Sequence, residues 1–390
     1  MKLDKAFLRR GLKRAAIRLL LRPYYALCCR RPVENSLVLL ADGHQTSMPY
    51  SMQAIAAALG AEKDLRVVEY FQDYSFCGFF ESLRIMLRFL PLYARARTVF
   101  ICDYFVPTAC GKRPETTLVQ LWHSGGLMKK LGMDSPEDAK GFLPEMYRNV
   151  DVFTASSPLV SNVLSKAVGL PPERFSPAGV TRIDLLYDKT REEGIRRRFA
   201  EAHPELSGKR LVLWAPTFRG NVRGAYLIGS EEILRLQREL PEQYALVIKT
   251  HRFSNSAALN TLGDFSSEEL LALADLLITD YSSIYFDYLY YRRPIVLFAP
   301  DLAQYEAERG LYPDYRSLPG RFAADYDALR DAVLTADRWA DSAYFAALDR
   351  LWESDMAYCD GHSCEKLLAQ LGISENAEGK NTERRSKRSM

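Results

Sequence analysis

His123 is one of the residues of this 390-residue sequence best suited to chemistry. It stands at the end of the apolar run 117–122 and is followed closely by Gly125 and Gly126. Histidine titrates near neutral pH, and a glycine-rich turn exposes N–H groups that bind an oxyanion. The pattern predicts proton transfer by His123 beside a bound phosphate. The alternative is a histidine that only hydrogen-bonds a neighbouring loop.

A second histidine, His251, follows the apolar run 245–248 together with Lys249. Arg219 follows another apolar run, 211–215, in the same way. Cationic side chains that meet at one edge of a sheet form a cleft suited to a pyrophosphate.

A Ser/Asp-rich turn lies inside the segment 276–301, LLITDYSSIYFDYLYYRRPIVLFAPD. The order of strand, turn, aromatic helix and strand is that of a βαβ unit. Thr279 ends the first strand, and Asp280, Ser282 and Ser283 can cap the helix. The free N–H groups at the start of that helix are a potential phosphate site. The alternative is that these residues serve only as caps.

These residues must be positioned by parallel sheets, because ligands of open α/β sheets collect outside the carboxyl ends of the strands. Apolar runs predict strands in each half of the chain, with helices between them. The predicted strands are 37–41, 65–70, 98–102, 117–122 and 151–155 in the first half, and 211–215, 245–249, 276–279 and 295–298 in the second.

The predicted organisation follows from these strands. The segment 192–204 reads as a helix that crosses between the halves, and 390 residues are too many for one core. We therefore predict an α/β protein with two Rossmann-like, doubly wound domains facing each other across a cleft, the GT-B architecture. The predicted parts are a basic amphipathic segment (1–34), a first domain (35–195), a second domain (196–373) and a disordered tail (374–390). A helix is also predicted from Leu127 onward, with Lys129 and Lys130 in its first turns.

Composition excludes several classes of protein. A net charge of +3 without an aromatic–basic repeat argues against nucleic-acid binding. Seven scattered cysteines predict reduced thiols in a cytosolic compartment. Cys359, His362 and Cys364 match no standard zinc spacing, so no metal is expected. Asp325 and Asp327 have the spacing of a metal-binding pair, but we interpret them as a helix start.

The N-terminal segment 1–31 carries ten Lys or Arg residues against one acid, Asp4. Its apolar stretch is too short and too closely flanked by arginine to span a bilayer or to serve as a signal peptide. The pattern predicts an interfacial helix on an anionic cytoplasmic membrane surface, and 82–97 is a second candidate surface. The alternative is a solvated basic helix that packs on its own domain.

Several motifs, in order, carry a family resemblance: WHSGGLMKKLG, WAPTFRG, IKTH and ITDYSSIYFDYLYYRRPIVLFAPD. From about Leu37 to Gly320 the chain resembles the CDP-glycerol glycerophosphotransferases of teichoic-acid and related surface-polymer synthesis. Two departures concern the finer choice of substrate. The family often has Gly-Thr-Pro where this chain has Ser124, Gly125 and Gly126, and often Pro where this chain has Arg252.

The resemblance implies transfer of glycerol phosphate from CDP-glycerol to a hydroxyl of a lipid-linked glycan or glycerophosphate acceptor, releasing CMP. The enzyme would be peripheral, at the cytoplasmic face of the cell membrane, and would need no cofactor or metal. His123 would be the base, with His251 the second catalytic histidine. The implied donor site consists of Arg219, Lys249, Thr279, Asp280, Ser282, Ser283 and Asp287, and the acceptor side of Asp42, His44, Gly125 and Gly126.

Alternatives remain at this stage. Asp42 and His44 follow the first predicted strand, and His44 is either a second acid–base residue or a loop histidine with no role. The transferred unit is either glycerol phosphate or a related polyol phosphate such as ribitol phosphate. A metal-independent glycosyltransferase that uses a nucleotide sugar shares the predicted fold, and so does a membrane-bound scaffold that has lost catalysis.

Overall fold

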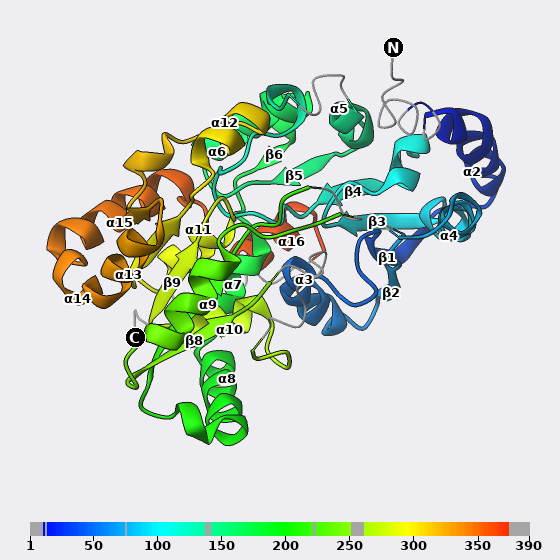
Figure 1. The fold of residues 1–390 in the computed structure, drawn as a ribbon. Helices are drawn as coiled ribbons and strands as arrows, with labels where there is room; N and C mark the ends of the chain where they lie inside the picture. Colours follow the sequence, from blue (N-terminus) through cyan, green and yellow to red (C-terminus); the bar gives the residue numbers. More distant parts are fainter. Residues whose placement is uncertain are drawn as a thin grey trace, which may run out of the picture. The chain divides into compact units, whose positions relative to one another are not determined.

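The computed structural model describes residues 11, 14–74, 76–136, 142–220, 224–250 and 261–373 (Figure 1). The chain divides into two compact units, each built on a parallel sheet. The first unit comprises Met1–His123, Asp138–Leu185 and Ala357–Met390, and the second Ser124–Glu137 and Leu186–Met356.

The sheet of the first unit has the strand order β2-β1-β3-β4-β5-β6. Its strands are β1 (Glu34–Asp42), β2 (Arg66–Phe71), β3 (Ala96–Ile101), β4 (Thr117–Gln120), β5 (Val152–Thr154) and β6 (Phe175–Ser176). All of the strands predicted in the first half are confirmed, whereas β6 was not predicted because two residues carry no periodic signal. The strand order reverses between β1 and β3, which makes the carboxyl ends of these strands a topological switch point.

Alternate side chains of each strand point to opposite faces of this sheet, and helices pack against them. Val38 and Leu40 of β1 share a buried cluster with residues of α3 and α16, so Leu37 and Leu39 face the opposite side of the sheet. The helices and turns of the unit are η1 (Ile17–Leu21), α2 (Arg22–Cys28), α3 (Tyr50–Gly60), α4 (Phe79–Tyr93), η2 (Val106–Cys110), α5 (Phe142–Tyr147), α6 (Pro158–Val168), η4 (Pro172–Arg174), η5 (Thr181–Ile183), the first part of α7 (Asp184–Tyr187) and α16 (Ser363–Gln370).

The sheet of the second unit has the order β11-β10-β9-β7-β8. Its strands are β7 (Arg210–Ala215), β8 (Tyr244–Ile248), β9 (Leu276–Thr279), β10 (Ile295–Phe298) and β11 (Arg321–Ala323). The four strands predicted in this half are confirmed, and β11 was missed. The order reverses between β7 and β9, so this sheet too has a switch point.

A buried cluster on one face of this sheet joins Trp214, Ile248 and Ile278 to Ile233 of α9 and Leu329 of α13. The helices and turns of the unit are η3 (Gly132–Asp134), α8 (Lys189–Ala202), η6 (Pro204–Leu206), α9 (Ser230–Glu239), α10 (Ser267–Leu273), α11 (Ile284–Leu289), α12 (Leu302–Glu308), η8 (Tyr315–Ser317), α13 (Tyr326–Leu334), α14 (Ala336–Trp339) and α15 (Ser342–Asp355). The predicted crossing helix is present as α8, and Asp325 caps α13 as interpreted from the sequence.

The predicted domain boundary lies near residue 195, whereas the chain passes into the second unit at Ser124 and, after returning to the first unit, again at Leu186. Two segments also belong to the opposite half from the one their sequence position indicates. Residues 124–137 join the second unit, and 357–373 return to the first, where α16 packs on α3. Long-range packing decides this membership, and a linear reading of strand order does not reveal it.

The prediction of a helix from Leu127 onward is wrong. Lys129 instead pairs with Leu311 in an antiparallel bridge. The N–H of Lys130 donates to the carbonyl of Gly310, and the N–H of Tyr312 donates to the carbonyl of Met128. These backbone groups therefore pair two segments that are distant in the sequence, and the short turn η3 follows.

The predicted capping of the helix after the Ser/Asp-rich turn is only partly correct. Ser283 occupies the N-cap position of α11 without a side-chain cap, and Ser282 Oγ accepts a long hydrogen bond of 3.4 Å from the Ile284 N–H. Asp280 does not cap this helix, because its Oδ1 accepts from the N–H of Thr217.

The predicted basic segment and tail lie largely or wholly outside the described residues, which omit 1–10, 12, 13 and 374–390. Within the described ranges, the segment continues as η1 and α2, which pack near α4. In those same ranges no helix is both long and apolar enough to cross a membrane.

Candidate active site

The switch point of the first sheet gathers polar residues that follow β1 and β3. Oδ1 of Asp42 accepts a 2.7 Å hydrogen bond from the backbone N–H of His44. The His44 ring lies edge-on to Tyr104 with 5.1 Å between ring centroids. Asp103, next to Tyr104, accepts hydrogen bonds from the Tyr104 N–H and the Tyr147 hydroxyl. The structure thus places Asp42 and His44 at the edge where ligands of such sheets bind.

His123 lies just beyond β4 at the same edge. Its ring lies tilted against the Trp122 ring, with 4.6 Å between the ring centroids, and its carbonyl accepts a 2.6 Å hydrogen bond from Nη1 of Arg182. Solvent reaches the residue, yet the protein packed around the ring lowers the pKa of His123 below its ordinary value. Asp103 raises this pKa and Arg182 lowers it further, while a hydrogen bond with the Cys102 backbone and the nearby His44 add opposing smaller effects. The imidazole is therefore neutral at neutral pH and able to accept a proton.

Two residues of this cluster escaped the sequence analysis. Asp103 is the second residue after β3, so its place near the carboxyl end of a strand was a usable signal. Arg182 sits in η5, at the end of the first half, and its local sequence gives no indication that it contacts His123.

The switch point of the second sheet is closed by hydrogen bonds between the residues that follow β7 and β9. Oδ1 of Asp280 accepts from the Thr217 N–H at 2.8 Å, and the Thr279 hydroxyl donates to the Ala215 carbonyl at 2.8 Å. Thr279 and Asp280, both predicted for the donor site, are buried at this edge of the sheet.

Arg219 is held by two carboxylates. Its Nε and Nη2 donate to both oxygens of Asp301, at 2.7 and 3.0 Å, and its Nη1 lies 3.0 Å from Asp280. Burial alone would lower the pKa of Arg219, but Asp301 and Asp280 outweigh it and raise that pKa. The guanidinium lies over the rings of Tyr281 and Tyr305. The sequence analysis counted Arg219 among the cations of a pyrophosphate-binding cleft. In the structure its positive charge is instead paired with the carboxylates of Asp301 and Asp280.

A cavity of about 200 Å³ opens beside this cluster, within the second unit. Burial lowers the pKa of Lys129 to about 8, and nearby Arg309 and Arg219 act in the same direction against Asp280. Oγ1 of Thr217 is buried and finds no hydrogen-bond partner in the part of the unit that the structure describes. The cavity is lined by Lys129, Thr217, Phe218, Arg219, Gly220, Tyr226, Ile228, Asp301, Gln304, Tyr305, Glu308 and Arg309.

The remaining residues predicted for the donor site differ in burial and in their hydrogen-bond partners. Nζ of Lys249 donates to the Phe265 carbonyl, and burial lowers its pKa against the opposing charge of Glu268. Ser282 and Ser283 are partly buried before α11, and Asp287 is buried within it. His251 lies outside the described residues.

The glycines predicted for the acceptor side belong to the second unit. A Cβ atom added to Gly126 would lie 2.2 Å from Cε1 of Phe286, and one added to Gly125 would lie 2.9 Å from the Met356 side chain. These glycines allow a close approach of the chain to α11. Within the described ranges, no group of three or more His, Cys, Asp or Glu side chains is arranged to hold a metal.

Comparison with known proteins gives the family. The family model described as CDP-Glycerol:Poly(glycerophosphate) glycerophosphotransferase matches residues 24–371. The teichoic acid ribitol-phosphate primase of Bacillus spizizenii is 27% identical over 368 residues, covering 88% of this chain and 92% of that protein. The teichoic acid glycerol-phosphate primase of Bacillus subtilis is 29% identical over 301 residues, covering 73% of this chain and 75% of that protein.

Solved structures agree on the fold. The wall teichoic acid polymerase TagF superposes with a TM-score of 0.73 at 18% identity, covering 96% of this chain and 100% of that one. The Staphylococcus aureus MnaA–UDP structure has a TM-score of 0.53 at 14% identity, covering 87% and 98%. The predicted pair of Rossmann-like domains of the GT-B type is confirmed. Because the family model spans most of its length, the protein belongs to the CDP-glycerol:poly(glycerophosphate) glycerophosphotransferase family.

Proposed function

We propose that the protein transfers glycerol phosphate from CDP-glycerol to a hydroxyl of a lipid-linked acceptor and releases CMP, in the synthesis of a teichoic-acid-like or capsular polymer. Membership of the family supports transfer of a polyol phosphate. The observation that carries the proposal is His123, a histidine at the carboxyl edge of a parallel sheet with its pKa lowered, since a neutral imidazole there is a competent base.

The donor diphosphate is assigned to the cavity of the second unit. Its volume of about 200 Å³ is below the roughly 300–1,000 Å³ of a pocket for a whole small ligand, so only part of the donor fits there. Lys129 and Arg309 offer positive charge, and Thr217 Oγ1 offers a hydroxyl that has no partner among the described residues. Arg219, neutralised by its carboxylates, acts in this proposal by orienting Asp280 and Asp301.

Lys249, His251, Ser282 and Ser283 complete the proposed donor site, with Asp287 nearby. The carboxyl edge of the sheet supports this assignment for Lys249, which directly follows β8, and for the two serines, which lie in the turn after β9. For His251 and Asp287 the support is the family resemblance.

The proposed reaction is an in-line displacement at phosphorus. The acceptor hydroxyl oxygen attacks the phosphorus that bears glycerol, and His123 takes the hydroxyl proton. The bond from this phosphorus to the bridging oxygen breaks, and the electron pair leaves with CMP. Fixed cations and backbone N–H groups stabilise the negative charge that develops on the leaving phosphate.

The acceptor side is assigned to the switch point of the first sheet. Asp42 and His44 lie there, with Asp103 and Arg182 adjusting the basicity of His123. Gly125 and Gly126 belong to the second unit, and their place in the proposed acceptor side has the support of the family resemblance alone.

CDP-ribitol is the second candidate donor. The match to the ribitol-phosphate primase covers 88% of this chain, more than the 73% covered by the glycerol-phosphate primase. The two donors share the diphosphate and differ by two CHOH units of the polyol, so the residues assigned to the diphosphate would serve both.

We also propose that the protein works at the anionic cytoplasmic surface of a membrane, where a lipid-linked acceptor resides. The basic composition of residues 1–31 supports this location.

The test is CMP release by the purified protein from CDP-glycerol, CDP-ribitol and UDP-N-acetylglucosamine, each with a soluble lipid-disaccharide analogue. We expect CMP only from a CDP-polyol and only with acceptor. UDP release, or no binding of either CDP-polyol, would contradict the proposal.

A further inference from the structure

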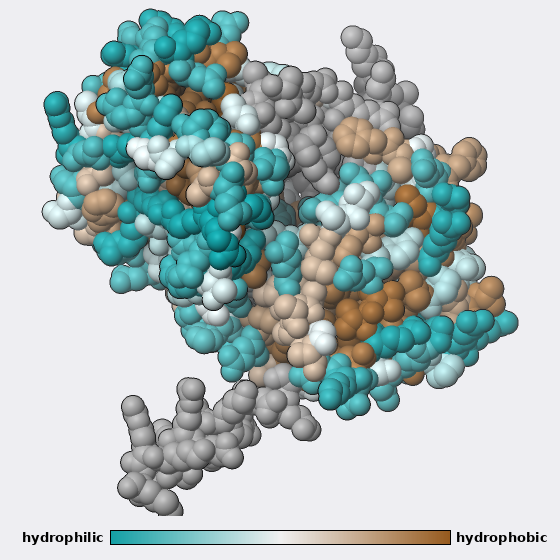
Figure 2. Space-filling view, turned by 90° about the horizontal axis from the view of Figure 1, so that it is seen from below, coloured by the Kyte–Doolittle hydropathy of each residue, from teal (hydrophilic) through white to brown (hydrophobic). Residues whose placement is uncertain are grey.

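Helices α2 and α4 of the first unit pack side by side and expose apolar side chains that the fold does not cover. Figure 2 shows a patch of hydrophobic surface bordered by hydrophilic side chains. Seven of the eleven exposed large hydrophobic side chains in the described part of the chain come from these helices and the turns beside them: Leu19, Leu20, Tyr24, Leu27, Phe76, Phe79 and Phe80.

The helical segment of η1 and α2 is apolar on two sides. Ile17, Leu21 and Tyr25 are buried and anchor the segment to its unit. Leu20 and Tyr24 lie on another side and remain exposed by 44% and 37%. A surface helix needs one apolar side to pack on its own protein. The second side therefore indicates a partner that is itself apolar.

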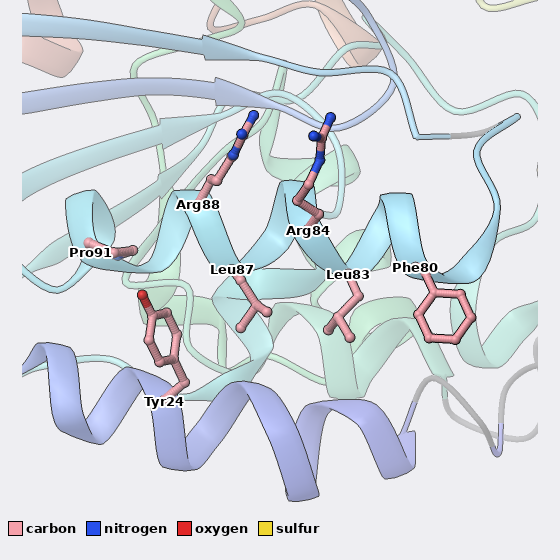
Figure 3. A pocket seen from close by; sticks show the side chains of 7 residues that line it. All are labelled: Tyr24, Phe80, Leu83, Arg84, Leu87, Arg88 and Pro91. Atoms are coloured by element: carbon pink, nitrogen blue, oxygen red, sulfur yellow. The ribbon is translucent and has the colours of Figure 1, made fainter.

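A groove of about 470 Å³ runs between the two helices (Figure 3). Figure 3 shows Leu83 and Leu87 of α4 pointing toward α2, with Tyr24 rising from α2 to meet them. Phe80 and Pro91 lie toward the ends of the row on α4. The walls are thus mostly hydrocarbon, and their shape is that of a channel open along one side.

Arginines border this groove. Arg84 and Arg88 line it, are exposed, and extend from α4 away from α2 in Figure 3. Arg18 is also exposed on the neighbouring segment. Across Ile17–Cys28 and Phe79–Tyr93, all of which the structure describes, Glu81 is the single acidic residue. An apolar channel with cationic borders is complementary to a hydrocarbon chain that carries an anionic head group.

We propose that the α2–α4 face docks on an anionic phospholipid leaflet, and that the groove between the helices takes one acyl chain of a bilayer lipid while Arg84 and Arg88 contact its phosphate. This inference deepens the membrane location proposed above and rests on that part of the proposal. It makes no use of the transfer chemistry.

The first experiment measures binding of the full-length protein to vesicles of POPC with 30% POPG and to vesicles of POPC alone. Leu83→Gln/Leu87→Gln should weaken binding to the anionic vesicles by about tenfold or more, since both side chains would leave hydrocarbon. Leu159→Gln is the matched control, because Leu159 is 48% exposed on α6 of the same unit, and it should bind as the wild type does.

The arginines should act only through charge. Arg84→Gln/Arg88→Gln should weaken binding to POPG vesicles by about fivefold per arginine and leave binding to POPC vesicles unchanged. Arg238→Gln, at an exposed position on α9, is the control and should change neither.

The groove itself is tested with a single-chain probe, monomeric myristoyl lysophosphatidylglycerol. The wild type should bind it saturably. Leu87→Trp should abolish that binding by filling the groove, yet keep vesicle binding, because Trp partitions well into the interface. Lysolipid binding by Leu87→Trp at the wild-type level would overturn the chain site.

Two further results would overturn the proposal: wild-type vesicle binding by the Leu83/Leu87 variant, or an equal loss in Leu159→Gln. A lowered midpoint of thermal unfolding would show that the Leu83/Leu87 variant does not fold properly. In that case vesicle binding by Arg84→Gln/Arg88→Gln decides the question. Each vesicle assay contains neither donor nor acceptor. It therefore succeeds or fails independently of CMP release with a soluble acceptor, which tests the proposed reaction.

Discussion

The backbone N–H of Thr217 donates a 2.8 Å hydrogen bond to Oδ1 of Asp280, joining the segments that follow β7 and β9. The other oxygen of Asp280 lies 3.0 Å from Arg219. One carboxylate thus holds together the backbone and the charge of the second switch point. The edge where we propose that the donor diphosphate binds is therefore linked by both a hydrogen bond and an ion pair of Asp280.

Asp280→Asn keeps an oxygen acceptor for Thr217 but removes the charge that faces Arg219. We expect the free energy of unfolding to fall by about 2–3 kcal/mol, because the buried guanidinium then has only Asp301 as a counter-charge. The dissociation constant of CDP-glycerol should rise at least about tenfold as the site loosens. Urea denaturation and calorimetric titration measure the two effects.

The matched control is Asp327→Asn, on the exposed first turn of α13. It should change the free energy of unfolding by less than about 0.5 kcal/mol. If Asp280→Asn matches this control in both measurements, the carboxylate does not organise the site.

His123→Ala should lower turnover by about two to four orders of magnitude and leave CDP-glycerol binding near the wild-type value, since only proton removal is lost. Single-turnover CMP release and donor titration separate the two quantities. Turnover within a few fold of the wild type would remove His123 from the role of base.

The pH dependence of kcat/KM should report the surroundings of His123. A base is active in its neutral form, so the rate is full above its pKa and lost as the pH falls through it. Since the pKa of His123 is lowered, the acid limb should lie below about pH 6.5, the ordinary value.

Asp103 and Arg182 should shift this limb in opposite directions. Asp103 raises the pKa of His123, so Asp103→Asn should move the limb to lower pH. Arg182 lowers the pKa, so Arg182→Gln should move the limb to higher pH. A shift of both variants in the same direction would indicate a general change of structure instead.

Lys129 should make donor binding depend on pH. Burial lowers the pKa of Lys129 to about 8, so the ammonium charge in the cavity is lost as the pH rises through that value. We expect affinity for CDP-glycerol to fall by about tenfold between pH 7 and pH 9.

Two variants check this titration. Lys129→Arg, charged throughout, should bind with little dependence on pH, and Lys129→Gln should bind weakly at every pH. A decline in Lys129→Gln as steep as in the wild type would assign the effect to another group.

Gly126→Ala should destabilise the second unit. The added Cβ would lie 2.2 Å from the Phe286 ring, so α11 or the 124–126 turn must move. We expect a loss of about 1–3 kcal/mol in the free energy of unfolding, partly recovered by Phe286→Leu in the same chain. Gly194→Ala in α8 is the control, because nothing lies within 4 Å of its added Cβ, and it should stabilise by about 0.5–1 kcal/mol. Equal effects of the two substitutions would show that the close contact at Gly126 is unimportant.

Most of the architecture could be predicted from the sequence because its signals are local. The longer strands are apolar runs of the right length, and their carboxyl ends carry the polar residues of both switch points. His123, Asp42 and Asp280 were therefore found at strand ends without knowledge of which strands are neighbours. The strands β6 and β11 were missed, since β6 has only two residues and the three residues of β11 begin with an arginine and form no apolar run.

Only the tertiary structure decided which charges meet. Arg219 and Asp301 are 82 residues apart, and their pairing converts a predicted phosphate-binding cation into a compensated one. The tertiary structure also decided the backbone conformation at Lys129, which pairs with Leu311 in an antiparallel bridge and does not form the predicted helix. Local sequence determines where a strand ends and which side chain stands there. The charge state and partners of that side chain depend on residues that reach it through packing, and packing is a property of the folded chain.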